Sequence, residues 1–172
     1  MSGFELQLTG GHPNSLGNTV AVVESVLEDP TRFEELFNCY FSEDEVVRLR
    51  VSNAMKRLGK ADIGFLLPYV DRFLEEISKI DQASTQWTLS QLFLLLEKEL
   101  DAGQREKVQE IMKNNLAGHT DWIVLCQTME TLSRWAKKDQ NLAIWLVPHL
   151  DRLENDPRNS VSKKAKKVKA LL

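Results

Sequence analysis

Apolar residues recur along most of this chain every three or four positions, as they do on the buried face of an α-helix. Polar capping residues precede these periodic stretches, and glycines or Asp-Pro steps interrupt them. No stretch of useful length alternates apolar and polar residues as a half-buried strand does. The pattern therefore predicts an all-α protein. The predicted helices span approximately residues 19–27, 31–40, 43–58, 63–80, 82–100, 103–116, 121–136, 139–153 and 160–172.

Two helix starts carry specific capping patterns. Asn18 stands before the first helix, where its side chain is expected to accept a hydrogen bond from the first turn. Ser42 and Glu45 form a capping box, in which the hydroxyl accepts from the first turn and the carboxylate reaches back. Residues 1–17 hold four of the eight glycines and a proline, which predicts an irregular lead-in. Residues 18–172 are predicted to form a single domain.

A short motif repeats inside the second helices of the predicted helix pairs. Leu67–Phe73 and Val147–Leu153 both read apolar-Pro-x-apolar-Asp-Arg-apolar, and they lie 80 residues apart. This separation equals two periods of 40 residues, and a period of that length built from two helices is typical of an α-solenoid. The predicted units span approximately residues 18–41, 42–80, 81–119 and 120–158, with a terminal helix over 159–172.

The first helices of two units sharpen this interpretation. Val47–Leu58 has an apolar-Arg pair, then small residues, then a large apolar residue, and it resembles the first helix of a HEAT repeat. Asp156–Ala165 resembles the start of another such repeat. The resemblance covers roughly residues 20–172. It implies a right-handed α-solenoid of HEAT-like or armadillo-like repeats, with about four units, the last of them partial, and with the second helices lining a concave side.

An aromatic and basic stripe is predicted on that concave side. Its residues recur at i, i+4 and i+7 in two of the second helices, and aromatic residues with arginine are the composition of a binding hot spot. The intervening second helix aligns less clearly, and three polar residues are the best candidates for its exposed face. An alternative is that Phe65 and Trp145 pack between neighbouring units. The predicted stripe consists of Phe65, Tyr69, Arg72, Arg105, Gln109, Lys113, Trp145, His149 and Arg152.

Charge is distributed unevenly along the chain, whose net charge is −3. From Arg158 onward there are six basic residues and no acidic one, whereas the preceding 157 residues carry a net charge of −9. The last helix is therefore basic and amphipathic. It is a candidate for contacting phosphates or an anionic lipid surface, for capping the array, or for meeting the acidic front of a second copy. The lysines concerned are Lys163, Lys164, Lys166, Lys167 and Lys169.

The sequence also argues against several classes of protein. No apolar run approaches the roughly 20 residues that a membrane-spanning helix needs. The first 17 residues lack the basic and apolar regions of a secretory signal. Cys39 and Cys126 lie in apolar helical patterns and are predicted to be buried, reduced thiols, which fits a cytoplasmic location. The three histidines are scattered, so no metal site, catalytic triad or cofactor site is predicted.

The predicted function is therefore a non-enzymatic interaction or scaffold module that binds a protein on its concave face. The alternative is a nucleic-acid-binding protein that uses the basic last helix. DNA alkylation-repair glycosylases consist of similar HEAT-like repeats, but the acidic body of this chain opposes phosphate binding. Some bilin lyases of phycobiliproteins are also built from such repeats, although nothing in this sequence specifies a bilin pocket. No small-molecule substrate is indicated.

Overall fold

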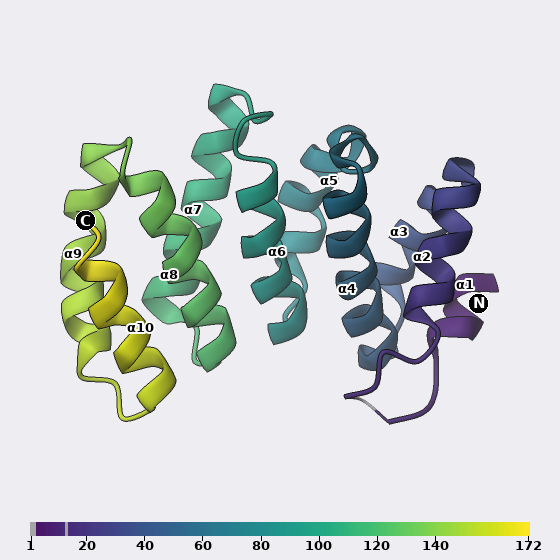
Figure 1. Ribbon diagram of the computed structural model, residues 1–172, viewed down its shortest axis with the longest axis horizontal. Helices are drawn as coiled ribbons and strands as arrows, with labels where there is room; N and C mark the ends of the chain where they lie inside the picture. The colour runs from purple at the N-terminus through teal and green to yellow at the C-terminus, as the bar shows by residue number, and fades with distance from the viewer. Residues whose placement is uncertain (1–2, 13) are drawn as a thin grey trace. The chain divides into compact units, whose positions relative to one another are not determined.

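The computed structural model describes residues 3–12 and 14–172, and over these residues it is all-helical without a strand (Figure 1). The all-α prediction is thus confirmed. No helix in the described part of the chain is long and apolar enough to cross a membrane. The α-helices are α1 Gly3–Leu8, α2 Thr19–Glu28, α3 Phe33–Asn38, α4 Glu45–Ala61, α5 Val70–Glu75, α6 Ala83–Leu95, α7 Ala102–Gly118, α8 Trp122–Ala136, α9 Gln140–Glu154 and α10 Asn159–Lys169.

The chain divides into two compact units, Met1–Glu99 and Leu100–Leu172. The first contains nine Lys and Arg residues against sixteen Asp and Glu, a net charge of −7, and we call it the acidic unit. The second contains thirteen basic against nine acidic residues, a net charge of +4, and we call it the basic unit. The expectation of one continuous domain over residues 18–172 stays a prediction.

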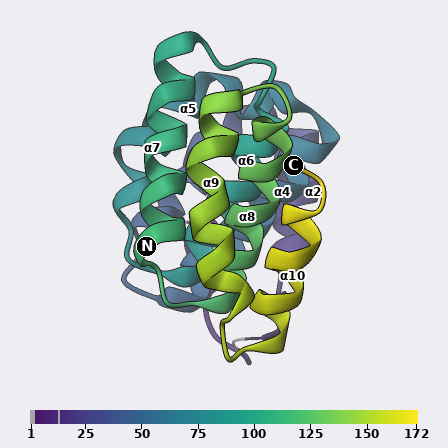
Figure 2. The ribbon, with the colours of Figure 1, turned by 90° about the vertical axis from the view of Figure 1, so that its left-hand side faces the viewer.

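Each unit has two layers of helices. In the acidic unit α2, α4 and α6 lie side by side, with α3 and α5 behind them (Figure 1). In the basic unit α8 and α10 form one layer, and α7 and α9 form the other (Figure 2). The apolar stripes of the sequence fill the space between the layers. In α10, for example, Val161, Ala165 and Val168 are buried, as their helical spacing predicts.

The lead-in is more ordered than its glycines suggest. Residues 1–17 were expected to be irregular, but α1 forms there, because Phe4 and Leu8 are spaced one helical turn apart and are both fully buried. The expectation of an irregular segment is therefore wrong for this stretch. The remainder of the described lead-in is a loop that surrounds a buried arginine of α4.

That arginine is Arg50 of α4, whose side chain is 2% exposed. Its guanidinium donates to the backbone carbonyls of Leu8 and Gly10, both at 2.6 Å, and to two further carbonyls of the lead-in. Gly17 has a φ of +51°, and a Cβ atom there would lie 2.8 Å from the Arg50 Cζ. The glycines therefore allow the loop to close around a cation.

Both predicted caps differ from the observed ones. The Asn18 side chain makes no cap hydrogen bond and instead donates to the Gln7 carbonyl at 3.1 Å. Asp44, rather than Ser42, caps α4, because its Oδ1 accepts from the Val46 N–H at 2.8 Å. The Ser42 hydroxyl accepts from the Asp44 N–H, one step earlier, and so orients the capping residue.

The helix predicted over residues 63–80 is broken. Two 3₁₀ turns, Ile63–Phe65 and Leu67–Tyr69, precede α5, and a third follows it at Ile77–Lys79. Pro68 explains the late start of α5, since it has no N–H to donate and crowds the preceding turn. Pro148, its counterpart in the repeated motif, lies inside the continuous helix α9. The two prolines therefore do not impose the same local geometry.

Candidate functional site

In the acidic unit the predicted stripe packs against α3. The Phe65 ring lies 5.6 Å from the Phe33 ring, measured between centroids. The Tyr69 ring lies 4.7 Å from that of Phe33 and 4.8 Å from that of Phe37. Phe33 and Phe37 are themselves buried. The aromatic faces in this part of the stripe are therefore covered by α3, which lies in the predicted repeat 18–41, next to the predicted repeat 42–80 that holds Phe65.

The polar ends of this stripe also have partners. The Tyr69 hydroxyl donates to Glu34 Oε2 at 2.6 Å, and Arg72 Nη1 donates to Glu34 Oε1 at 2.9 Å. These contacts, the Tyr69 hydrogen bond foremost, lower the pKa of Glu34. Burial and the Glu34 carboxylate together raise the pKa of Tyr69 to about 12. Arg72 also pairs with Glu76 at 3.1 Å, so Tyr69 and Arg72 lie in one half-exposed network of hydrogen bonds and ion pairs around Glu34.

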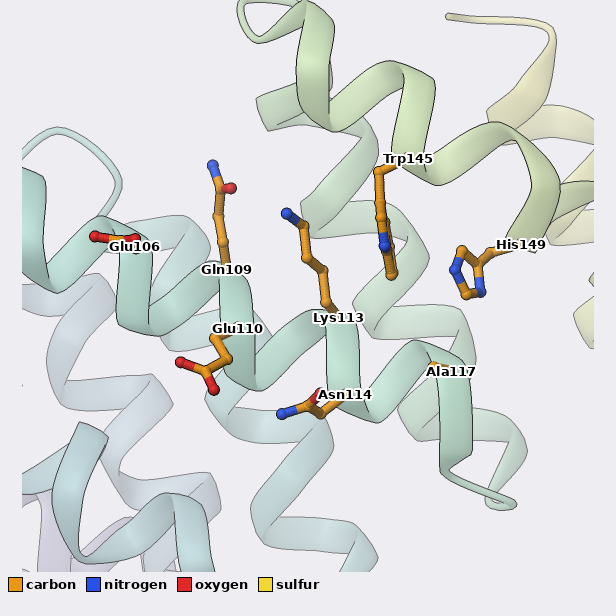
Figure 3. A pocket seen from close by; sticks show the side chains of 8 residues that line it. All are labelled: Glu106, Gln109, Glu110, Lys113, Asn114, Ala117, Trp145 and His149. Atoms are coloured by element: carbon orange, nitrogen blue, oxygen red, sulfur yellow. The ribbon is translucent and has the colours of Figure 1, made fainter.

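In the basic unit the stripe borders an open pocket of about 620 Å³ between α7 and α9 (Figure 3). Trp145 and His149 project from α9 and are stacked, with ring centroids 4.1 Å apart and planes 28° apart. Lys113 Nζ, from α7, lies 5.3 Å from the Trp145 ring centroid. The pocket is lined by Glu106, Gln109, Glu110, Lys113, Asn114, Ala117, Trp145 and His149.

Four predicted residues line this pocket and two do not. Gln109 lines it and also donates to Asp139 Oδ2 at 3.1 Å, which ties α7 to the start of α9. Arg105 turns to the Trp135 ring, 5.2 Å from its guanidinium carbon. Arg152 donates to the Leu116 carbonyl at 2.8 Å. Both arginines therefore contact residues that do not line the pocket, and they do not line it themselves.

The sequence prediction missed half of the lining, all of it on α7. The missed residues follow the helical spacing i, i+4, i+8 and i+11. They lie on the exposed face of α7 next to the predicted face of Arg105, Gln109 and Lys113. That spacing is readable in the sequence, so the sequence could have indicated this face of α7. The predicted face differs from the observed one by a shift of one residue. The missed residues are Glu106, Glu110, Asn114 and Ala117.

The pocket combines a stacked aromatic pair with charges of both signs. Two carboxylates, Glu106 and Glu110, lie on the α7 wall, and Lys113 stands between them and the rings (Figure 3). Burial lowers the pKa of His149, and the positive charge of Arg152 lowers it further. His149 is therefore neutral at pH 7, where its ring stacks without adding charge. Such a surface suits recognition of an apolar or aromatic group flanked by polar atoms.

The basic helix α10 is partly paired within its own unit. Lys164 bonds to Glu130 of α8, and Lys169 pairs with Asp151 at 2.6 Å and Glu154 at 3.3 Å. Within the described part of the chain, the three remaining lysines make no ion pair and are exposed to solvent. Two of the five predicted lysines thus fasten α10 to its neighbours. The three exposed lysines are Lys163, Lys166 and Lys167.

The thiols and candidate metal ligands give no second site. Cys39 is buried, but Cys126 is only half-buried, so the prediction that both are buried is wrong for Cys126. Neither forms a disulfide with a residue that the structure describes. Burial raises the pKa of the Cys126 thiol, which makes it a poor nucleophile at neutral pH. Among the residues with a described placement, no group of three His, Cys, Asp or Glu side chains is arranged to hold a metal ion.

Comparisons with known proteins gave no match. No protein-family model matches the chain, and neither the curated proteins nor the solved structures contain a match to it. The likeness to HEAT repeats accordingly rests on the motifs of Val47–Leu58 and Asp156–Ala165 and on the 80-residue spacing of Leu67–Phe73 and Val147–Leu153.

Proposed function

We propose that this chain is a non-enzymatic protein-binding module, built as a HEAT-like α-solenoid, that acts in the cytoplasm and binds a partner at the α7/α9 pocket of its basic unit. The observation that carries the proposal is the open pocket beside Trp145. Its aromatic pair lines that pocket, whereas in the equivalent stripe of the acidic unit the rings of Phe33 and Phe37 cover the aromatic faces. The lack of a disulfide between Cys39 and Cys126 agrees with a reducing compartment.

The helix arrangement supports the solenoid part of the proposal. Both units alternate helices between two layers, as stacked two-helix repeats do. The repeated motif falls on second-layer segments in both units, at Leu67–Phe73 and Val147–Leu153. In a solenoid this layer forms a preformed surface, which binds with little rearrangement and little loss of conformational entropy.

The lining of the pocket supports a peptide segment as the partner. Trp145 supplies the aromatic anchor that is typical of interface hot spots. Glu106 and Glu110 lie on the opposite wall and favour a positively charged group, while Lys113 and Asn114 offer hydrogen-bond donors. A segment with an apolar or aromatic anchor and a neighbouring Lys or Arg fits these groups best.

Site-specific photocrosslinking tests the proposal. A photoreactive amino acid at Asn114, which lines the pocket, is expected to crosslink a protein from native extract. The same group at Ile144, which is 65% exposed on α9 but outside the pocket, serves as the matched control. Trp145→Ala in the Asn114-labelled chain should abolish the crosslink, and Trp122→Ala should not, since Trp122 is an exposed tryptophan away from the pocket.

Three outcomes would contradict the proposal. Equal crosslinking from Asn114 and Ile144 would mean that the pocket is not the binding surface. Persistence of the crosslink in Trp145→Ala would mean that the aromatic pair only packs α7 against α9. Loss of all bound protein after nuclease treatment would instead favour nucleic-acid binding, for which the exposed lysines Lys163, Lys166 and Lys167 and the charge of the basic unit are the supporting observations.

A further inference from the structure

A second pocket lies between α8 and α10, the helices of the other layer of the basic unit. Its volume is about 330 Å³. The two helices lie side by side in both views of the molecule (Figures 1 and 2). This pocket shares no lining residue with the α7/α9 pocket. It is lined by Glu130, Ser133, Arg134, Lys137, Lys167, Val168 and Leu171.

Positive charge predominates at this second pocket. Arg134 Nη2 pairs with Glu130 at 2.8 Å, and Lys164 pairs with the other oxygen of the same carboxylate. Lys137 and Lys167 are exposed and form no ion pair with any residue that the structure describes. Four cations therefore surround one carboxylate, and two of the four have no counter-ion of their own.

Helix ends account for part of this charge. Lys137 follows the last residue of α8, and Lys167 lies in the last turn of α10, positions where cations are favoured by the helix dipole. Each helix end carries about half a negative charge, so the two ends together offset about one of the four cations. Glu130 offsets another. About two positive charges remain without a partner, which is the charge of a dianion.

We propose that the α8/α10 pocket binds a phosphate monoester, whose terminal phosphate is a dianion near neutral pH. Arg134, whose side chain is 58% exposed, donates to Glu130 through Nε and Nη2, and its Nη1 group is the donor that it offers to a phosphate oxygen. Lys137 and Lys167 supply point charges on either wall. Val168 and Leu171 form the apolar part of the lining, against which the organic part of the ester packs.

The size of the pocket favours a small phosphate group over a nucleic-acid strand. A strand needs a row of cations that follows its backbone, whereas these cations converge on one cavity. The acidic unit, with a net charge of −7, repels a long polyanion. The monoester is either free in solution or the headgroup of a lipid such as phosphatidic acid. This inference is independent of the partner proposed for the α7/α9 pocket.

Titration calorimetry on the full chain tests the inference, with glycerol 3-phosphate as the free probe. Saturable binding is expected at low ionic strength, with weaker binding as salt is added. Amide chemical-shift changes should centre on Ser133–Lys138 and Lys163–Leu171. Succinate, a dianion without a phosphate group, is the chemical control. Equal affinity for succinate, or no saturable binding of either phosphate source, would overturn the assignment.

Lipid vesicles distinguish the two sources of the phosphate group. Phosphatidylcholine vesicles that contain phosphatidic acid present a monoester, and vesicles with phosphatidylglycerol at the same surface charge present a diester. Binding of phosphatidic acid vesicles together with weak binding of free glycerol 3-phosphate identifies a lipid headgroup as the ligand. Strong binding of the free ester identifies a soluble one. Equal binding to both vesicle types overturns the inference, because surface charge alone would then explain it.

Paired lysine variants separate a built site from general attraction. Lys137→Gln/Lys167→Gln removes the two unpaired cations of the pocket, and the affinity for glycerol 3-phosphate should fall about tenfold or more. Lys163→Gln/Lys166→Gln removes the same charge from exposed positions outside the pocket and should cost about twofold at most. Equal losses in the two variants would overturn the site.

Glu130→Gln is expected to increase the affinity for glycerol 3-phosphate, whereas the lysine variants decrease it. The change removes the carboxylate that lines the pocket and retains a side chain that can still accept hydrogen bonds. If the pocket binds a dianion, glycerol 3-phosphate should bind several-fold more tightly to this variant at low salt. Unchanged or weaker binding, with an unchanged circular dichroism spectrum, would show that the cations serve only to fasten α10 to α8.

Discussion

Tyr69 and His149 hold the same place in two stripes that lie 80 residues apart, yet their surroundings differ. In the acidic unit Tyr69 is enclosed by the rings of Phe33 and Phe37, and its hydroxyl bonds to Glu34. In the basic unit His149 stacks on Trp145 and both border an open pocket. Both stripes are half-buried, but α3 covers the aromatic faces of the first, whereas the rings of the second line a pocket.

The neighbouring helix of the same layer accounts for this difference. In the acidic unit that helix is α3, which contributes two phenylalanines and a carboxylate placed to meet the tyrosine. In the basic unit it is α7, which contributes Gln109, Lys113 and Ala117 at the corresponding face. Polar or small residues leave the aromatic pair of α9 partly uncovered. A repeated motif therefore determines where a side chain points, while the neighbouring helix determines whether that side chain is available for binding.

The largest expected effect comes from uncovering the stripe of the acidic unit. Phe37→Ala removes a fully buried ring that contacts Tyr69 and supports the Arg72 guanidinium, 4.3 Å from its centroid. The loss of buried area and the cavity left behind should lower the free energy of unfolding by about 3–5 kcal/mol. Urea denaturation followed by circular dichroism measures it.

Trp145→Ala is the matched comparison for that experiment. Because Trp145 is only half-buried, its removal should cost about 1 kcal/mol. Similar costs for Phe37→Ala and Trp145→Ala would mean that the α3 ring over the first stripe contributes no more than the half-buried ring of the second, and the contrast between covered and open stripes would not stand.

A second way to open the acidic unit is through Arg50. Arg50→Ala removes the donor that holds four carbonyls of the lead-in, and we expect a loss of about 2–3 kcal/mol. Amide hydrogen exchange should rise in residues 8–12 and 14–17, because the guanidinium bonds to four carbonyls of this loop. Arg57→Ala is the control, because Arg57 is exposed and bonds to Asn53 of its own helix. An unchanged exchange pattern in Arg50→Ala would contradict the anchoring role.

The hydrogen bond of Tyr69 gives a smaller and pH-dependent effect. Tyr69→Phe should destabilise the chain by about 1 kcal/mol at pH 7. The pKa of Tyr69 is raised from an ordinary value of about 10 to about 12, so the folded state holds its proton more tightly than the unfolded state. This stabilisation is fully present below pH 10 and is lost as the pH rises through 12. Ultraviolet titration of tyrosinate, with Tyr69→Phe as reference, would refute this if the transition that is lost in Tyr69→Phe lay near pH 10.

Helical periodicity predicted the elements well where neighbours did not intervene. The buried faces of α4 and α10 follow from helical spacing alone, whereas the caps predicted at Asn18 and Ser42 are wrong because Asn18 bonds to the Gln7 carbonyl and Asp44 caps α4. The segment after Asp62 is not the continuous helix that its periodicity predicts, because Pro68 shifts the helix start. The sequence pattern does not reveal whether a helix accommodates a proline, as α9 accommodates Pro148. Local rules are sufficient only when the chain meets no competing backbone constraint.

The candidate sites were harder to predict because they depend on contacts between distant residues. Arg50 looks like any polar residue on a helix, and only the path of the lead-in makes it a buried anchor. The lysines of α10 were recognised, but their meeting with Arg134 and Lys137 of α8 requires the fold. The α7 register was missed by one position, since exposure on that helix is set by α9 and the sequence of α7 is polar nearly all round.

The smallest expected effect concerns His149, and it tests whether the open stripe is set by burial or by charge. The pKa of His149 lies below its ordinary value of about 6.5, with burial as the larger cause and Arg152 as the smaller. The folded state therefore disfavours protonation, so stability is retained above pH 6.5 and decreases as the pH falls through the folded-state pKa. Binding at the α7/α9 pocket should weaken over the same range, because a charged imidazolium replaces a neutral stacking ring.

Nuclear magnetic resonance titration of the His149 ring measures this shift directly. Arg152→Gln should raise the pKa only part of the way to the ordinary value, since burial is unchanged, whereas Trp145→Ala should raise it more by admitting water to the ring. The reverse order would show that the charge of Arg152, rather than burial against Trp145, keeps His149 neutral. The stacked pair would then be a consequence of electrostatics in the basic unit, and the covered and open stripes would differ by charge rather than by packing.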